Sequence, residues 1–196
     1  NFNAFKLIES WPGWPSRFVN IFGPTGCGKT HLVNILMTKI QCVMVIADRV
    51  DEKVLTKFKT KECLIIDDFN NNIGENLLYS IINLASQDNK YLIISSPISI
   101  KKFKIKLKDL NSRFTSFIDI GIDLPTDELL RVILTKYFSD KQIDISKKNI
   151  DYILNKIDRS YEKINLFADS VDKLSLTNAK PINLSLIKKV LEKIKQ

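Results

Sequence analysis

The sequence is poor in the residues that build many catalytic and metal centres. It contains one histidine, His31, and three cysteines, none of them spaced as CxxC. A single histidine excludes histidine-based metal centres and Ser-His-Asp triads by inventory. The odd number of cysteines argues against a disulfide framework or a zinc site, so Cys27, Cys42 and Cys63 are expected to be reduced thiols of a cytoplasmic protein.

Membrane and targeting segments are also absent from the sequence. No apolar run is long enough to span a bilayer, and no signal-peptide pattern opens the chain. We therefore expect no membrane association. The first residue is Asn1 rather than Met, which leads us to expect that a natural N-terminal segment is missing.

Acidic residues are outnumbered by basic ones, so the net charge is +8 and the isoelectric point is about 9.3. This balance is compatible with nucleic-acid contact, and equally with a biased composition rich in Lys, Ile and Asn. Arginine is scarce, so each arginine is more informative than each lysine. The arginines are Arg17, Arg49, Arg113, Arg131 and Arg159.

Apolar runs alternate with helical patterns up to about Asp123. The five runs expected to form buried parallel strands are residues 17–22, 42–47, 63–67, 91–95 and 116–120. The helical patterns between them are residues 29–40, 51–58 and 75–87. This alternation predicts an α/β domain, residues 1–124, with a five-stranded parallel sheet flanked by helices.

The pattern changes after Leu124-Pro125. Thr126 can cap a helix whose first turn is acidic, and apolar residues follow at helical spacing. Further helical patterns cover residues 147–157, 161–174 and 184–194, with no strand signal between them. We expect a small all-helical lid domain over residues 125–196.

The segment GPTGCGKTHL, which begins at Gly23, matches the phosphate-binding pattern GxxxxGK[ST] between a predicted strand and a predicted helix. Its glycines allow several backbone N–H groups to converge on phosphate oxygens, and the helix directs its positive end toward the same place. Lys29 would contact the terminal phosphates, and the Thr30 hydroxyl would bind Mg²⁺. The side chains of Cys27 and His31 are given no chemical role. The expected cofactor-binding residues of this segment are Gly23, Pro24, Thr25, Gly26, Cys27, Gly28, Lys29, Thr30 and His31.

The run CLIIDDF supplies the acidic residues that such a site requires. An apolar strand that ends in Asp67 and Asp68 brings carboxylates to the edge of the sheet where ligands bind. Asp67 would hold the Mg²⁺ shell, and Asp68 would orient the attacking water as the catalytic acidic residue. A solvated pair at a strand end is the alternative.

Four motifs occur in order: GPTGCGKTHL, LIIDDF, DLNSRF and DRSYEKINLF. Together they resemble the AAA+ module of the DnaA/Hda family, and WPGWP at residues 11–15 is closer to the Hda branch. The resemblance covers essentially the whole chain. It implies ATP or ADP as cofactor with Mg²⁺, Arg113 as a catalytic arginine finger acting on a neighbour's nucleotide, and Arg159 as a lid arginine that contacts the bound nucleotide.

Two positions depart from that family. In IISSPIS, Pro97 replaces a family aspartate and leaves Ser95 and Ser96 as the polar candidates. Asp68 is also shorter than the glutamate of vigorous AAA+ ATPases. We therefore expect slow or absent intrinsic ATP hydrolysis.

The resemblance leaves an initiator and a regulator to distinguish. Initiators insert DNA-gripping helices after the second strand, but residues 48–62 leave room for one short helix, and no helix-turn-helix follows the lid before Gln196. The regulator hypothesis implies DnaA as partner, and the sliding clamp through the missing N-terminal peptide. The alternative hypothesis is a divergent initiator or helicase loader that binds nucleic acid. A small-molecule kinase is the third hypothesis. The sequence leaves open whether the protein forms homo-oligomers.

Two further segments have more than one interpretation. KKFKIKLK at residues 101–108 alternates with period two, which indicates an extended segment with one packed and one charged face. That charged face is either solvated or close to DNA bound by a partner. The rings of WPGWP either bracket the adenine or pack an N-terminal helix on the core, and the packing role is favoured because Trp buries a large area.

Overall fold

The computed structural model describes residues 6, 8–178 and 182–194. The described residues form two compact units. The first unit contains the residues up to Thr25 and Lys29–Asp123, and the second contains Gly26–Gly28 and the residues from Leu124 onward. None of the described helices is both long and apolar enough to cross a bilayer.

The first unit is built on a parallel sheet whose five described strands correspond to the five predicted apolar runs. They are β1 (Phe18–Phe22), β2 (Cys42–Ile46), β3 (Cys63–Asp67), β4 (Tyr91–Ser96) and β5 (Ile118–Gly121), in the order β2-β3-β4-β1-β5. Leu92–Ile94 in the central strand β4 and Leu64–Ile66 in its neighbour β3 are fully buried, as expected for a sheet covered on both faces.

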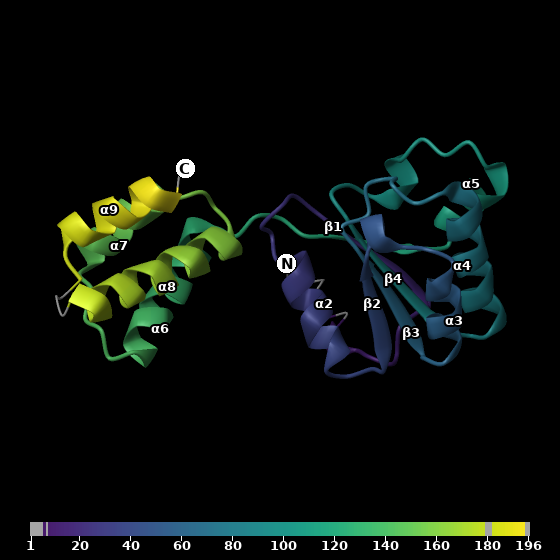
Figure 1. Cartoon of the computed structure of the whole chain (residues 1–196), viewed down its shortest axis with the longest axis horizontal. Coiled ribbons are helices and arrows are strands. Elements are labelled where there is room, and N and C mark those ends of the chain that lie inside the picture. Colours follow the sequence, from purple (N-terminus) through teal and green to yellow (C-terminus); the bar gives the residue numbers. More distant parts are fainter. Residues whose placement is uncertain (1–5, 7, 179–181, 195–196) are drawn as a thin grey trace. The chain divides into compact units, whose positions relative to one another are not determined.

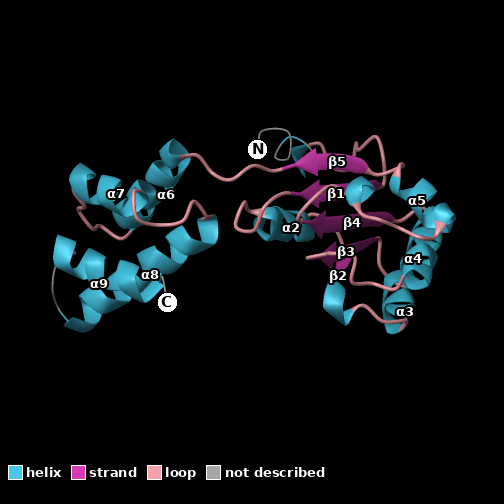
Figure 2. Cartoon of the chain, turned by 90° about the horizontal axis from the view of Figure 1, so that it is seen from above, coloured by secondary structure: helices cyan, strands magenta, loops and turns pink. Residues whose placement is uncertain are grey.

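Helices cover both faces of this sheet (Figures 1 and 2). Helix α2 (Lys29–Met37) lies on one face, and α3 (Lys53–Lys59), α4 (Glu75–Gln87) and α5 (Lys108–Phe114) lie on the other. A core of buried residues joins this second group of helices to the sheet, with Phe58, Phe69 and Phe114 among its largest members. The predicted five-stranded α/β fold is therefore confirmed.

The predicted extended form of residues 101–108 is only partly right. Ile100–Lys102 forms the 3-10 turn η2, Lys108 already begins α5, and no strand forms between them. The alternation itself is confirmed, because Phe103, Ile105 and Leu107 pack against the core while the lysines between them are exposed.

The two tryptophans of WPGWP pack on Tyr91, with ring centroids 4.3 Å from Trp11 and 5.8 Å from Trp14. Arg17 lies over the same tyrosine ring at 4.7 Å. Tyr91 is the first residue of β4, so this cluster lies at the amino ends of the parallel strands. Phosphate-binding loops lie at the carboxyl ends, and this placement supports the packing role over contact with adenine.

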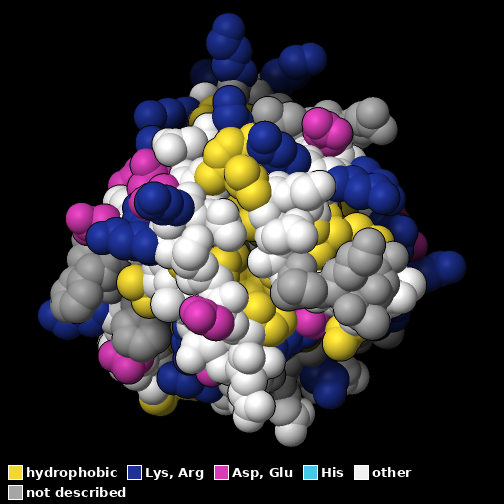
Figure 3. Space-filling model, turned by 90° about the vertical axis from the view of Figure 1, so that its left-hand side faces the viewer, with side chains coloured by type: hydrophobic (Ala, Val, Ile, Leu, Met, Phe, Trp, Pro, Cys, Tyr) yellow, Lys and Arg dark blue, Asp and Glu magenta, His cyan; other side chains and the backbone are white. Residues whose placement is uncertain are grey.

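The second unit consists of helices around one apolar core. Its helices are α6 (Asp127–Asp140), α7 (Lys147–Leu154), α8 (Tyr161–Asn178) and α9 (Leu184–Ile194). Thr126 caps α6 as predicted, because its hydroxyl accepts from Leu129 N. Phe138 and Phe167 are buried in the core. Apolar, basic and acidic side chains are interspersed on the face seen in Figure 3.

Candidate nucleotide-binding site

The phosphate-binding segment leaves β1 and enters α2 as the sequence predicts. Gly26 and Gly28 have φ angles of 81° and 103°, a region that side chains disfavour, so glycine fits these two positions. Gly23 N donates to the carbonyl of Ser96 at 3.1 Å. This bond ties the start of the loop to the carboxyl end of the neighbouring strand β4.

Lys29 folds back onto its own loop. Its ammonium donates to the carbonyls of Gly23 at 2.8 Å and Pro24 at 3.1 Å. These contacts hold a positive charge at the loop. A phosphate oxygen is a better acceptor than a backbone carbonyl, so the ammonium is placed to exchange one for the other.

The expected metal-binding residues lie side by side. Thr30 Oγ1 donates to Asp67 Oδ2 at 3.1 Å, although 37 positions separate them in the chain. A hydroxyl and a carboxylate are hard oxygen donors, and Mg²⁺ takes one or two such protein ligands together with water and phosphate oxygens. This pair fits Mg²⁺, which Thr30 and Asp67 would hold and which would neutralise phosphate charge.

Ser95 completes the acidic part of the site. Its hydroxyl donates to Asp67 Oδ1 and accepts from Asp68 N at 2.9 Å. Asp68 has a φ of 59°, a left-handed conformation that aspartate tolerates better than most residues. The Asp68 side chain is exposed, whereas the Asp67 side chain is buried.

Ser96, the other candidate in IISSPIS, contacts a different network. Its hydroxyl donates to Ile98 O at 2.7 Å and accepts from Asn20 Nδ2 at 2.8 Å. Successive residues of a strand point to opposite faces, and of these two serines only Ser95 contacts Asp67. Sequence reasoning did not single out Asn20, although it is the one polar residue within the strand FVNIF.

Arg113 occupies the last turn of α5 and is exposed. Its carbonyl accepts from Ser116 Oγ. Across the described residues its guanidinium has no hydrogen bond, ion pair or ring contact. This side chain is therefore available to an external anion.

Arg159, by contrast, is engaged within the second unit. Its Nε lies 2.7 Å from Asp127 Oδ1, and its Nη2 donates to Asp127 Oδ2 at 2.8 Å. The sequence did not indicate this two-point ion pair. Both side chains are about half exposed or more, so the pair is weak enough to open for a competing anion.

Cys27 is buried and His31 is exposed. All three cysteines are reduced thiols, as predicted. Burial raises the pKa of the Cys42 and Cys63 thiols, so both are neutral and poorly reactive.

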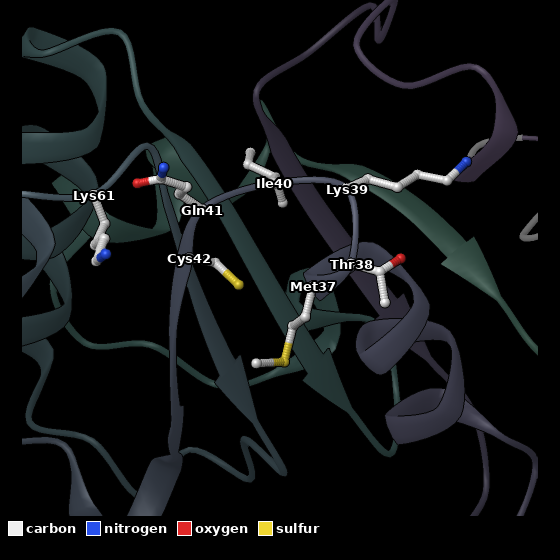
Figure 4. Close-up of a pocket in the computed structure, with 7 residues that line it drawn as sticks. All are labelled: Met37, Thr38, Lys39, Ile40, Gln41, Cys42 and Lys61. Carbon is white, nitrogen blue, oxygen red and sulfur yellow. The ribbon is translucent and has the colours of Figure 1, made fainter.

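A surface hollow of about 370 Å³ lies at the other edge of the sheet (Figure 4). It is lined by residues 37–42 and Lys61, and Cys42 is the first residue of β2. Lys39 points away from the other lining side chains, and its ammonium donates to Ile8 O at 3.3 Å. The hollow is therefore separate from the phosphate-binding loop.

Solved structures of other proteins share the fold of this chain. Domain III of the Thermotoga maritima replication initiation protein DnaA covers 98% of this chain and 90% of its own length, with a TM-score of 0.81 and 18% identity. The T. maritima RuvB Holliday junction branch migration motor covers 98% of this chain and 68% of its own length, with a TM-score of 0.74 and 19% identity. The chain thus has the AAA+ P-loop fold.

The sequence model of a family described as RNA helicase matches residues 19–116. This range is half of the chain, and the chain belongs to that family. The matched range runs from β1 through the phosphate-binding loop and Asp67 to the residues after α5. It therefore contains the phosphate-binding segment and the acidic residues at the end of β3.

Curated relatives extend the likeness into the second unit. An uncharacterized protein of Haemophilus influenzae is 25% identical over 187 residues, covering 89% of this chain and 81% of that protein. The chromosomal replication initiator protein DnaA of Borreliella burgdorferi (strain B31) is 24% identical over 98% of this chain. The chain spans only 44% of that initiator. It is accordingly a DnaA-like AAA+ domain.

Proposed function

We propose that this chain is an Hda-type regulator of replication initiation. It binds ATP or ADP with Mg²⁺ and supplies Arg113 in trans to ATP held by a DnaA initiator. The exposed, unpaired guanidinium of Arg113 is the observation that carries this proposal. A guanidinium that reaches transferring phosphate oxygens stabilises the charge of the transition state by about 10³- to 10⁵-fold in rate.

Nucleotide binding is supported by the geometry of the phosphate-binding segment and of Asp67 at the end of β3. The loop glycines, the Lys29 ammonium and the Thr30–Asp67 pair provide backbone donors, a mobile charge and metal ligands. A DnaA neighbour from Aquifex aeolicus, which is 20% identical with a TM-score of 0.69 over 90% of this chain, was solved with bound AMPPCP. We extend nucleotide binding to this chain as part of the proposal.

The short side chain of Asp68 supports a slow intrinsic ATPase. Its backbone is held in the left-handed region by the Ser95 hydroxyl, and its carboxylate is one methylene shorter than that of glutamate. A carboxylate that cannot reach the attacking water orients it poorly. The bound nucleotide then acts as a conformational signal, and Arg159 would read it by exchanging Asp127 for a phosphate.

The connection between β2 and β3 favours a regulator over an initiator. It contains the 3-10 turn η1 (Ala47–Arg49) and the single helix α3. Initiators of the DnaA/Hda family, which this sequence resembles, have helices that grip DNA at this position. The sliding-clamp contact implied by the same family lies outside the described residues.

The test follows ATP hydrolysis on the initiator from the same organism, loaded with labelled ATP. ADP formation is measured with and without this protein, in the presence and absence of clamp-loaded DNA. The expected result is an acceleration on the order of 10³-fold that is lost with Arg113→Ala and is not restored by Arg113→Lys, since lysine lacks the planar fork.

Lys136→Ala is the matched control, because Lys136 is an exposed cation on α6 of the second unit. It removes the same charge and should retain the acceleration. If the wild-type protein accelerates hydrolysis under none of these conditions, the regulator proposal is wrong.

A further inference from the structure

The segment from the turn η2 to the first residue of α5 carries four cations, which we call the lysine stripe: Lys102, Lys104, Lys106 and Lys108. All four are exposed. The residues between them, Phe103, Ile105 and Leu107, pack against the core of the first unit. The alternation therefore leaves every second side chain exposed.

The backbone of this segment is anchored before the lysine stripe and within it. Before it, Ile100 N donates to the buried Asn20 Oδ1 at 3.0 Å. Within it, the Glu75 carboxylate accepts from Lys106 N at 3.0 Å and Leu107 N at 2.7 Å. Together with the packed apolar side chains, these bonds hold the backbone that carries the lysines in place, although no strand forms.

Few acidic side chains among the described residues neutralise the charge of the lysine stripe. In the part of the chain that the structure describes, Lys102, Lys104 and Lys108 make no ion pair. Lys106 lies near Glu75, but both carboxylate oxygens of Glu75 accept backbone N–H groups. The neighbouring Lys101 is different, because it donates to Phe117 O and lies 3.8 Å from Asp119.

The clustering of these cations suits a phosphate backbone. Lys102 ends the turn η2, Lys108 begins α5 and the chain bends at Phe103 and Lys106, so the four lysines follow an irregular path within seven residues. One strand of a DNA duplex carries a phosphate about every 3.4 Å along the helix axis, and a cluster of cations matches this density of negative charge without needing a regular repeat.

The composition disfavours two other kinds of partner. Membrane-surface segments present apolar side chains to the lipid, whereas the apolar side chains of this segment face the core. Lysine is depleted in protein–protein interfaces, and the segment from Lys101 to Lys108 contains no arginine or exposed aromatic residue. Lysine used as a point charge on phosphate oxygens fits this composition.

We propose that the lysine stripe binds the phosphate backbone of nucleic acid without reading its sequence. This proposal goes beyond the action of Arg113 and does not rest on it. The function of the stripe would be to add a salt-sensitive, sequence-independent contact wherever a partner holds the protein close to nucleic acid.

The test uses the full chain and dye-labelled oligonucleotides, a 20-base-pair duplex and a matching single strand. Affinity is measured by fluorescence anisotropy at several salt concentrations. One variant changes Lys102, Lys104, Lys106 and Lys108 to Gln, and a control variant changes four exposed lysines of the second unit, Lys136, Lys147, Lys148 and Lys189, to Gln. Both variants lose the same net charge.

For the duplex, log affinity should fall with log salt concentration with a contribution of about −0.9 per phosphate contacted. The stripe variant should therefore lose about 3 to 4 from this slope, and at moderate salt it should bind at least 10-fold more weakly. The control variant should keep the wild-type slope. Equal losses in the two variants would mean that only net charge matters and would overturn the proposal.

Two further probes separate the other partners. Anionic vesicles and a polyglutamate peptide are titrated with the same three proteins. If the stripe variant loses binding to either probe while its binding to both oligonucleotides is unchanged, the nucleic-acid proposal is overturned. Loss confined to the oligonucleotides supports it.

Discussion

The hydroxyl of Ser95 joins the two acidic residues that follow the apolar run of β3. It donates to the carboxylate of Asp67 and accepts from the backbone N–H of Asp68. One small side chain on β4 thus fixes the rotamer of the expected metal ligand and the backbone of the expected water-orienting residue. Thr30 contacts the other oxygen of the same carboxylate.

Ser95→Ala should weaken Mg²⁺-dependent nucleotide binding by about 10-fold, because residues that orient a metal ligand commonly contribute 10- to 100-fold to metal affinity. The measurement is a titration with a fluorescent ATP analogue, with Mg²⁺ and with EDTA. The loss should be present only with Mg²⁺.

Ser96→Ala is the control for that experiment. Ser96 is the adjacent buried serine, and its hydroxyl bonds to Asn20 and Ile98 instead of Asp67. Its loss should lower stability without a Mg²⁺-specific change in affinity. Equal Mg²⁺-dependent losses in the two variants would contradict a specific role for Ser95.

The apolar pattern made the sheet and the acidic pair predictable from sequence. The run CLIID is buried at all five positions. Its continuous apolar residues predict a buried strand, and the same run shows that Asp67 lies at the end of that strand. The role of Ser95 was not visible, because Ser95 and Ser96 are both buried polar residues at the end of β4. Only the register of β4 against β1 and β3 decides which serine meets which partner.

Helix α5 was missed because it is short and its neighbours decide its form. It has seven residues and no side-chain cap at its start, and the preceding lysine alternation indicates extended backbone. Instead of a local capping residue, Glu75 accepts a hydrogen bond from Leu107 N at the N-cap position, and Glu75 lies 32 residues away in the chain. The pairing of Arg159 with Asp127 is equally distant in sequence, and periodicity carries no information about such contacts.

Tyr91→Ala should destabilise the first unit by about 2–4 kcal/mol, because one aromatic ring contacts Trp11, Trp14 and Arg17. Thermal unfolding followed by tryptophan fluorescence measures this change directly. Nucleotide affinity, measured well below the unfolding transition, should stay within about 2-fold, since a change of 0.4 kcal/mol or less is about 2-fold. A large loss of affinity would show that the aromatic cluster contributes to the nucleotide site after all.

Asp127→Asn should increase nucleotide affinity if Arg159 exchanges its carboxylate partner for a phosphate. The pair is exposed, with 62% and 47% of the two side chains accessible, and such pairs contribute about 0–1 kcal/mol, which limits the gain to about 5-fold. The gain should vanish in an Arg159→Ala background. A double-mutant cycle measured by nucleotide titration gives this coupling, and a gain that persists without Arg159 would exclude the exchange.

Glu75→Gln should lower stability at neutral pH and have progressively less effect in acid. The two backbone N–H groups of Lys106 and Leu107 lower the pKa of the Glu75 carboxyl below its usual value of 4.5, because they bond the charged form. A carboxyl with a lowered folded-state pKa adds stability above its unfolded pKa and loses it as pH falls through the folded value.

Urea unfolding of the wild type and Glu75→Gln at pH 7 and at pH 3.5 measures this difference. The wild-type advantage should be largest at pH 7 and should shrink below about pH 4.5, where protonated Glu75 comes to resemble glutamine. Glu62→Gln is the control, because Glu62 is an exposed carboxylate whose side chain makes no hydrogen bond within the described residues. An advantage that stays constant with pH would mean that the charge of Glu75 does not contribute to stability, because glutamine matches glutamate in size but replaces one acceptor oxygen by a donor amide.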